Sequence, residues 1–251
     1  MRRQRQGTKT TTQKERKTEI KPETRAKDDT PTPIPSTPQP QYGATQHAAF
    51  ATYASPATDE ERARALQDSL RVIIVRHPFT RLLSAYRDKM TKGRPRPEKF
   101  EYKALQTHIV AKYRSRHSGD HSHFPSFPEF VQFVIDSAGN FSSAADWREH
   151  VKCWIPYWVH CGVCQRDYNV IMKLETLEED QQFLVTLSQL NELRGRTSWV
   201  HLRGESSSQL AMHYYKELTR RQMLQLYTCY EPDFKLFQYS IHDFLAVAKD
   251  A

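Results

Sequence analysis

The segment Leu70–Met90, LRVIIVRHPFTRLLSAYRDKM, joins an apolar run to a helical pattern through a charged turn. Leu70 and residues 72–75 are aliphatic, as in a central strand of a parallel sheet that is covered on both faces. Pro78 suits the first turn of a helix because it has no amide proton to leave unpaired there. The apolar residues that follow keep helical spacing: Phe79, Leu82, Leu83, Tyr86 and Met90. The segment therefore predicts a strand, a turn and an amphipathic helix in an α/β fold.

The predicted strand–helix junction is suited to binding a phosphate. In open α/β sheets, ligands lie beyond the carboxyl ends of strands, where helix N-termini offer free amides and a positive dipole. The planar fork of an arginine forms two hydrogen bonds with phosphate oxygens, and a serine hydroxyl adds a compact donor. We expect Arg76, at the end of the strand, and Ser84, on the helix, to converge on one phosphate.

Four blocks of the chain, in order, resemble one family. The segment 75–90 resembles the 3′-phosphate-binding segment of carbohydrate sulfotransferases of the chondroitin, dermatan and HNK-1 type. FPSFPEFVQFVID (124–136) resembles the helix that follows it. CWIPYWVHCGVCQRDYNVIMKLETLEED (153–180) resembles the family's HWxP, CxPC and YDxIxKxETLxxD series, and residues 219–240 resemble LYxxYxxDFxLFxYS. The resemblance covers most of residues 46–245.

The resemblance implies a P-loop-like parallel sheet flanked by helices, and sulfate transfer from 3′-phosphoadenosine 5′-phosphosulfate (PAPS) to a glycan hydroxyl. It implies a galactosamine-containing acceptor and a place on the lumenal side of the Golgi membrane. The reaction that it implies uses no metal ion. By resemblance, the residues that bind the 3′-phosphate are Arg76, His77, Pro78, Phe79, Thr80, Arg81, Leu82, Leu83 and Ser84.

Two departures from the family bear on catalysis. The family's upstream segment, PKxxCTNWKR, whose lysine holds the 5′-phosphosulfate, has no counterpart in TTTQKERKTEIKPETRAK (10–27), so we expect a sulfotransferase-like domain that is N-terminally incomplete. Cys153 stands where the HWxP block has histidine, and a thiol is a different group from an imidazole base. His150, one helical turn away, is the weak candidate for the general base; the simpler alternative is a structural or solvated histidine. The alternative to an active enzyme is a truncated or inactive relative that retains nucleotide or glycan binding.

Composition divides the chain near residue 45. Residues 1–45 hold six of the 14 prolines and ten Lys and Arg against five Asp and Glu, with almost no large apolar side chains. Such a segment cannot bury enough surface to offset its chain entropy, so we expect a disordered basic tail before a domain at 46–251. The net charge of +8 belongs mostly to this tail. Because it lacks interleaved aromatic residues, we do not expect nucleic-acid binding.

No stretch approaches the 18 or so apolar residues that span a bilayer, and no signal-peptide core is visible. Asn140-Phe141-Ser142 is nevertheless an N-glycosylation sequon, which is typical of a secretory glycoprotein. Cys161-Gly-Val-Cys164 resembles half of a zinc site, but no second CxxC exists, so we favour a disulfide or buried thiols.

Three further features leave alternatives open. Lys173 and Glu175 are two residues apart near a predicted strand at 170–174, so they share one face of it. They either have a role in the cleft or form an ion pair at the end of the strand. In the second case, Thr176 caps the helix that follows. The cations of the loop 91–126 either attract an anionic polysaccharide or form a solvated surface. An aromatic set is predicted to be core: Tyr227, Tyr230, Phe234, Phe237 and Tyr239.

Overall fold

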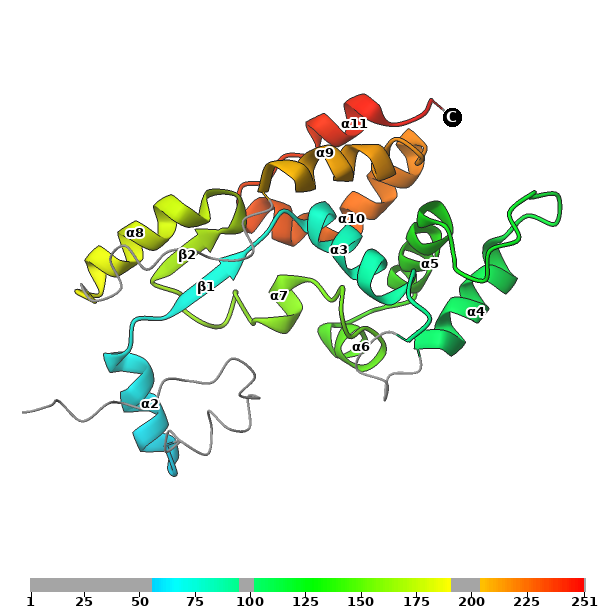
Figure 1. The fold of residues 1–251 in the computed structure, drawn as a ribbon. Helices are drawn as coiled ribbons and strands as arrows, with labels where there is room; N and C mark the ends of the chain where they lie inside the picture. The colour runs from blue at the N-terminus through cyan, green and yellow to red at the C-terminus, as the bar shows by residue number, and fades with distance from the viewer. Residues whose placement is uncertain (1–55, 95–101, 191–203, 251) are drawn as a thin grey trace, which may run out of the picture. The chain divides into compact units, whose positions relative to one another are not determined.

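The computed structural model describes residues 56–94, 102–190 and 204–250. The predicted tail at 1–45 and its boundary at 46 lie outside these ranges. The described elements, in chain order, are α2 (Asp59–Asp68), β1 (Val72–Val75), α3 (Pro78–Lys89), α4 (Tyr102–Tyr113), α5 (Phe127–Gly139), α6 (Ala144–His150), α7 (Tyr157–His160), β2 (Val170–Lys173), the 3₁₀ helix η2 (Leu174–Thr176), α8 (Leu177–Leu187), α9 (Gly204–Tyr215), α10 (Arg220–Leu236) and α11 (His242–Val247). The fold is α/β, with many helices around a small parallel sheet (Figure 1).

The sheet joins two segments that are far apart in the sequence. β1 pairs in parallel with β2, and the register aligns Val75 with Lys173. The chain between them forms α3 to α7, so the parallel pairing is reached by a long helical crossover. Both strands end at the same edge. There the chain turns into α3 after β1 (Figure 1), and into η2 after β2.

Each strand of the sheet is covered on one face. Ile73 and Val75 of β1 pack with Phe237 and with residues around α7, whereas Val170 and Met172 of β2 pack on the other face with Leu177 and Leu184 of α8. Ile74 is 49% exposed and Ile171 46% exposed. Among the described residues, the prediction of a central strand covered on both faces is therefore wrong at Ile74, which α8 leaves open, although Val72 on the same face packs against the cluster of β2 and α8.

Helix α3 confirms the helical pattern of the sequence. Pro78 is its first residue, and the predicted apolar positions Phe79, Leu82, Leu83, Tyr86 and Met90 are all at most 5% exposed. Phe79 stacks on Tyr215 of α9 with ring centroids 4.9 Å apart, and the Tyr215 hydroxyl donates to the Phe79 carbonyl at 2.9 Å. These contacts fix the N-terminal end of α3 in the largest hydrophobic core.

Helices α5 and α10 form the other side of this core. α5 begins with a capping box in which Ser126 and Glu129 satisfy each other's backbone amides, and it buries Phe127, Phe130 and Val131. α10 packs against α5, α3, α7 and α11, and buries Tyr230 and Phe234. Of the described helices, none combines the length and apolar character needed to cross a membrane.

Candidate functional site

The candidate site lies at the edge of the sheet where both strands end. Arg76 follows β1 directly, and Lys173, the last residue of β2, is aligned with Val75, the neighbour of Arg76. The N-terminus of α3 follows at Pro78. Two cationic side chains and a helix N-terminus therefore belong to one edge, the arrangement that favours an anion in an open α/β sheet.

The guanidinium of Arg76 is positioned by the first turn of α3. Its Nε donates to Thr80 Oγ1 at 2.9 Å, and the Thr80 hydroxyl donates in turn to the His77 carbonyl at 3.0 Å. Burial lowers the pKa of Arg76, an effect that the neighbouring Glu175 opposes. Within the described part of the chain, the two terminal nitrogens of Arg76 make no hydrogen bond or ion pair, so they remain as donors for an anion.

His77 holds the turn between β1 and α3 with a neutral ring. It is the N-cap of α3: its Nδ1 accepts from the Phe79 amide at 3.2 Å. Nε2 therefore carries the proton and donates to the Ser240 carbonyl at 3.0 Å. The rings of Phe234 and Phe244 lie 5.2 and 4.8 Å away, and burial lowers the pKa of His77. The cap, the carbonyl contact and the packing together fix the conformation of the residue after Arg76.

Glu175 links three segments that are distant in the sequence. Its Oε1 accepts from the backbone N–H of His77, and its Oε2 accepts from the Tyr239 hydroxyl, both at 2.8 Å. Burial raises the pKa of Tyr239, and the carboxylate beside it raises that pKa further, so the hydroxyl stays protonated and donates. The ammonium of Lys173 lies 4.8 Å from the centre of the Tyr239 ring. Glu175 thus supports the turn from the side of β2.

A second layer supports the site from α7 and α10. Arg81 Nη1 donates to the Ile155 carbonyl at 2.6 Å, and its guanidinium lies 4.4 Å from the centre of the Tyr157 ring. Asp233, which is fully buried, accepts from the backbone amides of Tyr157 and Trp158 at 2.7 and 2.9 Å. Burial raises the pKa of Asp233, although these amides oppose the rise. Arg81, Tyr157 and Asp233 therefore join α3, α7 and α10.

The nine residues predicted to bind the phosphate divide into two groups of four, with Ser84 apart from both. Pro78, Phe79, Leu82 and Leu83 are buried, and the last three belong to the largest hydrophobic core, so this group provides the framework. Arg76, His77, Thr80 and Arg81 form the polar contacts described above, and Ser84 is exposed. Ser84 follows Thr80 by one turn, or roughly 6 Å along the axis of α3. The structure therefore brings Thr80, rather than Ser84, into contact with Arg76, and a phosphate held by both Arg76 and Ser84 stays a prediction.

His150 and Cys153 lie outside this cluster. His150 ends α6, is exposed, and stacks on Phe141 with ring centroids 5.7 Å apart. It lines a pocket to which none of residues 76–84 contributes. The Sγ of Cys153 lies 2.8 Å from the Tyr102 hydroxyl of α4. His150 as the general base therefore stays a prediction.

The metal and cysteine predictions concern residues that are all described. No group of three or more His, Cys, Asp or Glu in the described ranges has the arrangement to hold a metal ion. The four cysteines are free thiols, with Cys161 half-buried and Cys164 exposed. Burial raises the pKa of Cys161. No disulfide forms between these cysteines. The other alternative, buried thiols, holds in part, because Cys153, Cys161 and Cys229 are half-buried.

Comparison with known proteins places the chain in a family. The family model described as "Sulfotransferase family" matches residues 9–240. The chain belongs to this family. The match includes β1, the turn at Arg76, Glu175 and Tyr239, so the candidate site lies within the part shared with the family.

Curated relatives are carbohydrate sulfotransferases. Carbohydrate sulfotransferase 10 of Danio rerio is 31% identical over 192 residues, covering 76% of this chain and 52% of that protein. Its Homo sapiens counterpart is 29% identical over 198 residues, with the same coverage of 76% and 52%. Carbohydrate sulfotransferase 11 of Rattus norvegicus is 26% identical over 189 residues, covering 72% and 49%. The chain thus spans about half the length of these relatives. No solved structure matches it.

Sequence reasoning missed the partners of the turn. The sequence leaves a cleft role and an ion pair with Lys173 open for Glu175. In the structure Glu175 bonds to His77 and Tyr239, and no ion pair with Lys173 forms among the described residues. Thr176 makes no side-chain cap; its hydroxyl donates to Asp180 at 2.9 Å. Tyr239 was predicted to be core. The only sequence signal for these contacts was the place of Glu175 just after a strand.

Proposed function

We propose that this chain transfers sulfate from PAPS to a hydroxyl group of a glycan, and that the turn 76–84 holds the 3′-phosphate of the donor. The observation that carries the proposal is Arg76: its Nε is fixed by Thr80 while its terminal nitrogens face no described partner, at the carboxyl end of a parallel strand. A charged, preoriented fork of this kind matches two oxygens of a phosphate. Membership of the sulfotransferase family supports the same assignment.

The reaction makes clear what such a site contributes. The bond between sulfur and the bridging oxygen of PAPS breaks and releases adenosine 3′,5′-bisphosphate, a bond forms from sulfur to the glycan oxygen, and the hydroxyl proton passes to a base or to solvent water. The 3′-phosphate takes no part in these bond changes. Arg76 and the N-terminus of α3 therefore bind and orient the donor, which converts binding energy into correct placement of the sulfuryl group.

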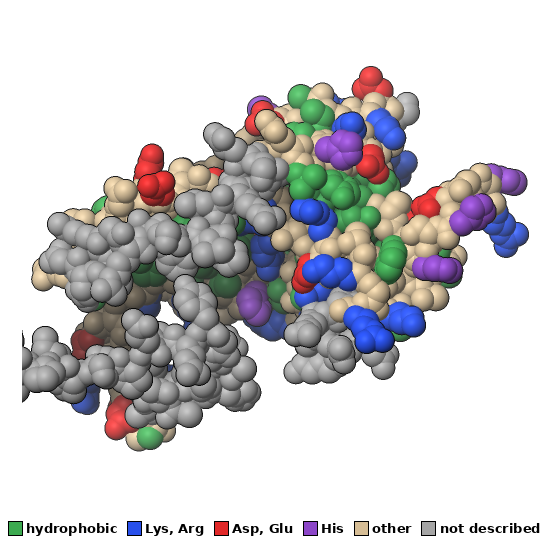
Figure 2. All heavy atoms as spheres, viewed as in Figure 1, with side chains coloured by type: hydrophobic (Ala, Val, Ile, Leu, Met, Phe, Trp, Pro, Cys, Tyr) green, Lys and Arg blue, Asp and Glu red, His purple; other side chains and the backbone are tan. Residues whose placement is uncertain are grey.

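The acceptor in this proposal is a galactosamine-containing polysaccharide. The printed names of the relatives describe carbohydrate sulfotransferases, which supports a glycan acceptor in general terms. On the face shown in Figure 2, Lys and Arg side chains gather over α3. Arg87 near the end of α3 and Arg94 after it are exposed. A positive surface of this kind attracts a polyanionic chain.

Family resemblance supports the lumenal side of the Golgi membrane as the location of the protein in this proposal.

A second candidate function is nucleotide or glycan binding without turnover. It is favoured by Cys153, which stands where the family has histidine and has the Tyr102 hydroxyl as its neighbour. Loss of a general base typically costs 10²–10⁴-fold in rate, roughly, while binding of the donor can persist.

The test is transfer of labelled sulfate from PAPS to desulfated chondroitin and dermatan, with Arg76→Ala as the test variant. Arg64→Ala is the control, because it removes an exposed cation from α2, a helix without buried residues. The proposal is supported if the rate of sulfate transfer falls at least about tenfold in Arg76→Ala and is unchanged in Arg64→Ala. Binding of adenosine 3′,5′-bisphosphate without transfer supports the second candidate. A protein that transfers no sulfate and binds neither the nucleotide nor the glycan contradicts both.

A further inference from the structure

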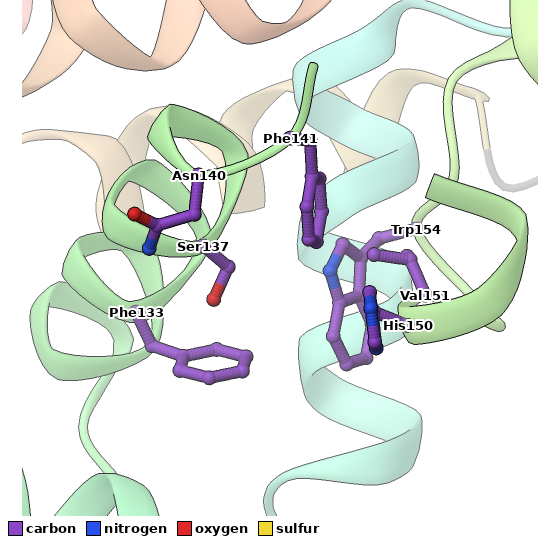
Figure 3. A pocket seen from close by; sticks show the side chains of 7 residues that line it. All are labelled: Phe133, Ser137, Asn140, Phe141, His150, Val151 and Trp154. Atoms are coloured by element: carbon purple, nitrogen blue, oxygen red, sulfur yellow. The ribbon is translucent and has the colours of Figure 1, made fainter. Parts of the chain in front are cut away.

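A pocket at the C-terminal end of α5 lies outside the candidate site and has no assigned role. Its volume is about 330 Å³, and it is lined by Phe133, Ser137, Asn140, Phe141, His150, Val151 and Trp154. Figure 3 shows two walls: Phe133 and Ser137 of α5 and its C-cap Asn140 lie on one side, while Phe141, Trp154, Val151 and His150 lie opposite. The size is at the lower end of ligand pockets, about 300–1,000 Å³, and suits a single ring.

The lining is aromatic, with polar groups but no Lys or Arg. Phe133 and Trp154 have ring centroids 6.5 Å apart at 78°, and His150 lies parallel to Phe141. Aromatic faces pack against the C–H groups of a pyranose, and Ser137 and His150 offer hydrogen bonds to its hydroxyls. Because an anionic polysaccharide requires cations, the chemistry of this lining fits a neutral sugar.

Asn140, which lines this pocket, is also the asparagine of the sequon Asn140-Phe141-Ser142. It is exposed at the C-cap of α5, and its Nδ2 donates one hydrogen to the Asp136 carbonyl at 2.8 Å. N-glycosylation replaces one hydrogen of Nδ2 and leaves the other as a donor. Phe133 and Ser137 precede Asn140 by seven and three residues, which places all three on one face of α5, with roughly 10 Å between the ends.

We propose that Asn140 carries an N-linked glycan whose first N-acetylglucosamine occupies this pocket. The covalent link keeps the sugar at an effective concentration in the millimolar range, so even weak stacking fills the site. The sugar covers the half-buried rings of Phe133 and Phe141 and so stabilises the junction of α5 and α6. The inference requires entry into the secretory pathway and is independent of sulfate transfer.

The experiment expresses the full chain through the secretory pathway of a mammalian cell line. The native glycoform is compared with a form trimmed by endoglycosidase to one N-acetylglucosamine and with Asn140→Gln. Ser142→Thr is the control, since it changes the sequon but keeps it functional. We expect the trimmed form and Ser142→Thr to match the native glycoform in Tm, and Asn140→Gln to unfold about 2–4 °C lower.

A second variant tests the pocket itself. Phe133→Leu keeps an apolar side chain but removes the ring. In a protein that carries Phe133→Leu, we therefore expect Asn140→Gln to lower the Tm by less than it does in the wild type. An unmodified Asn140 overturns the proposal, as does an equal Tm for all glycoforms. If the glycoforms are equally stable and Phe133→Leu instead raises the KM for an added glycan acceptor, the pocket binds the acceptor and the proposal is wrong.

Discussion

The backbone N–H of His77 donates to Glu175 Oε1 at 2.8 Å, a contact between residues 98 positions apart. This bond ties the turn that follows β1 to the 3₁₀ helix that follows β2. The other oxygen of Glu175 holds Tyr239, beside the carbonyl of Ser240 that His77 Nε2 contacts. Three segments therefore determine the position of Arg76, although none of them adjoins another in the sequence.

The Glu175 contacts predict a graded loss of stability. Glu175→Ala removes two hydrogen bonds to an exposed carboxylate, so the free energy of unfolding should fall by about 1–2 kcal/mol, measured by urea denaturation. Tyr239→Phe removes one of the two and should cost roughly half as much. Glu178→Ala, at a nearby exposed position of α8, is the matched control. A Glu175→Ala protein no less stable than the control would contradict the bridging role.

His77 predicts a pH dependence of stability. Burial holds its folded-state pKa below the ordinary 6.5, so the unfolded chain binds the proton more readily. The contribution of His77 is therefore fully present above pH 6.5 and is lost as the pH falls through the folded-state pKa. His77→Asn, which keeps a capping side chain, should remove this component. We expect the stability difference between wild type and His77→Asn to be larger at pH 7.5 than at pH 5; a difference independent of pH would show that the ring does not titrate as described.

Substitution of Asp233 is predicted to lower the stability of the fold strongly. Its carboxylate accepts the two amides that begin α7 and is fully buried. Asp233→Asn presents an NH₂ group to one of those amides, so we expect a loss of about 1.5–3 kcal/mol in the free energy of unfolding. Glu231→Gln, on the same helix but part of an exposed ion pair with Lys235, is the control and should change little. Equal stability of the two variants would mean that Asp233 does not anchor α7.

The strand and helix around Arg76 were predictable because their signals are local. The apolar run gives β1, and Pro78 with the spacing of Phe79, Leu82 and Leu83 gives α3 and its buried face. The contacts of Glu175 were not predictable, since periodicity along one segment says nothing about a partner 98 residues away. The exposure of Ile74 escaped prediction for a similar reason: an apolar strand residue does not reveal which faces other elements cover.

The candidate site was predicted in position but not in its details. Arg76 was identified from its place at the end of a strand, and the structure confirms that place. Thr80, counted only as part of the turn, proved to be the direct partner of Arg76, because residues four apart on a helix face the same way. Tyr239 was assigned to the core from its aromatic character, whereas its hydroxyl supports the site through Glu175.

The central claim is that Arg76 binds the 3′-phosphate of the donor nucleotide. The most direct measurement is calorimetric titration of wild type and Arg76→Ala with adenosine 3′,5′-bisphosphate and with adenosine 5′-monophosphate, which lacks that phosphate. Loss of a charge-assisted contact of about 1.5–3 kcal/mol predicts a 10- to 150-fold weaker affinity for the bisphosphate, with little change for the monophosphate. Ser84→Ala should cost less, because it removes a neutral donor. Equal affinity of wild type and Arg76→Ala for the bisphosphate would contradict the claim.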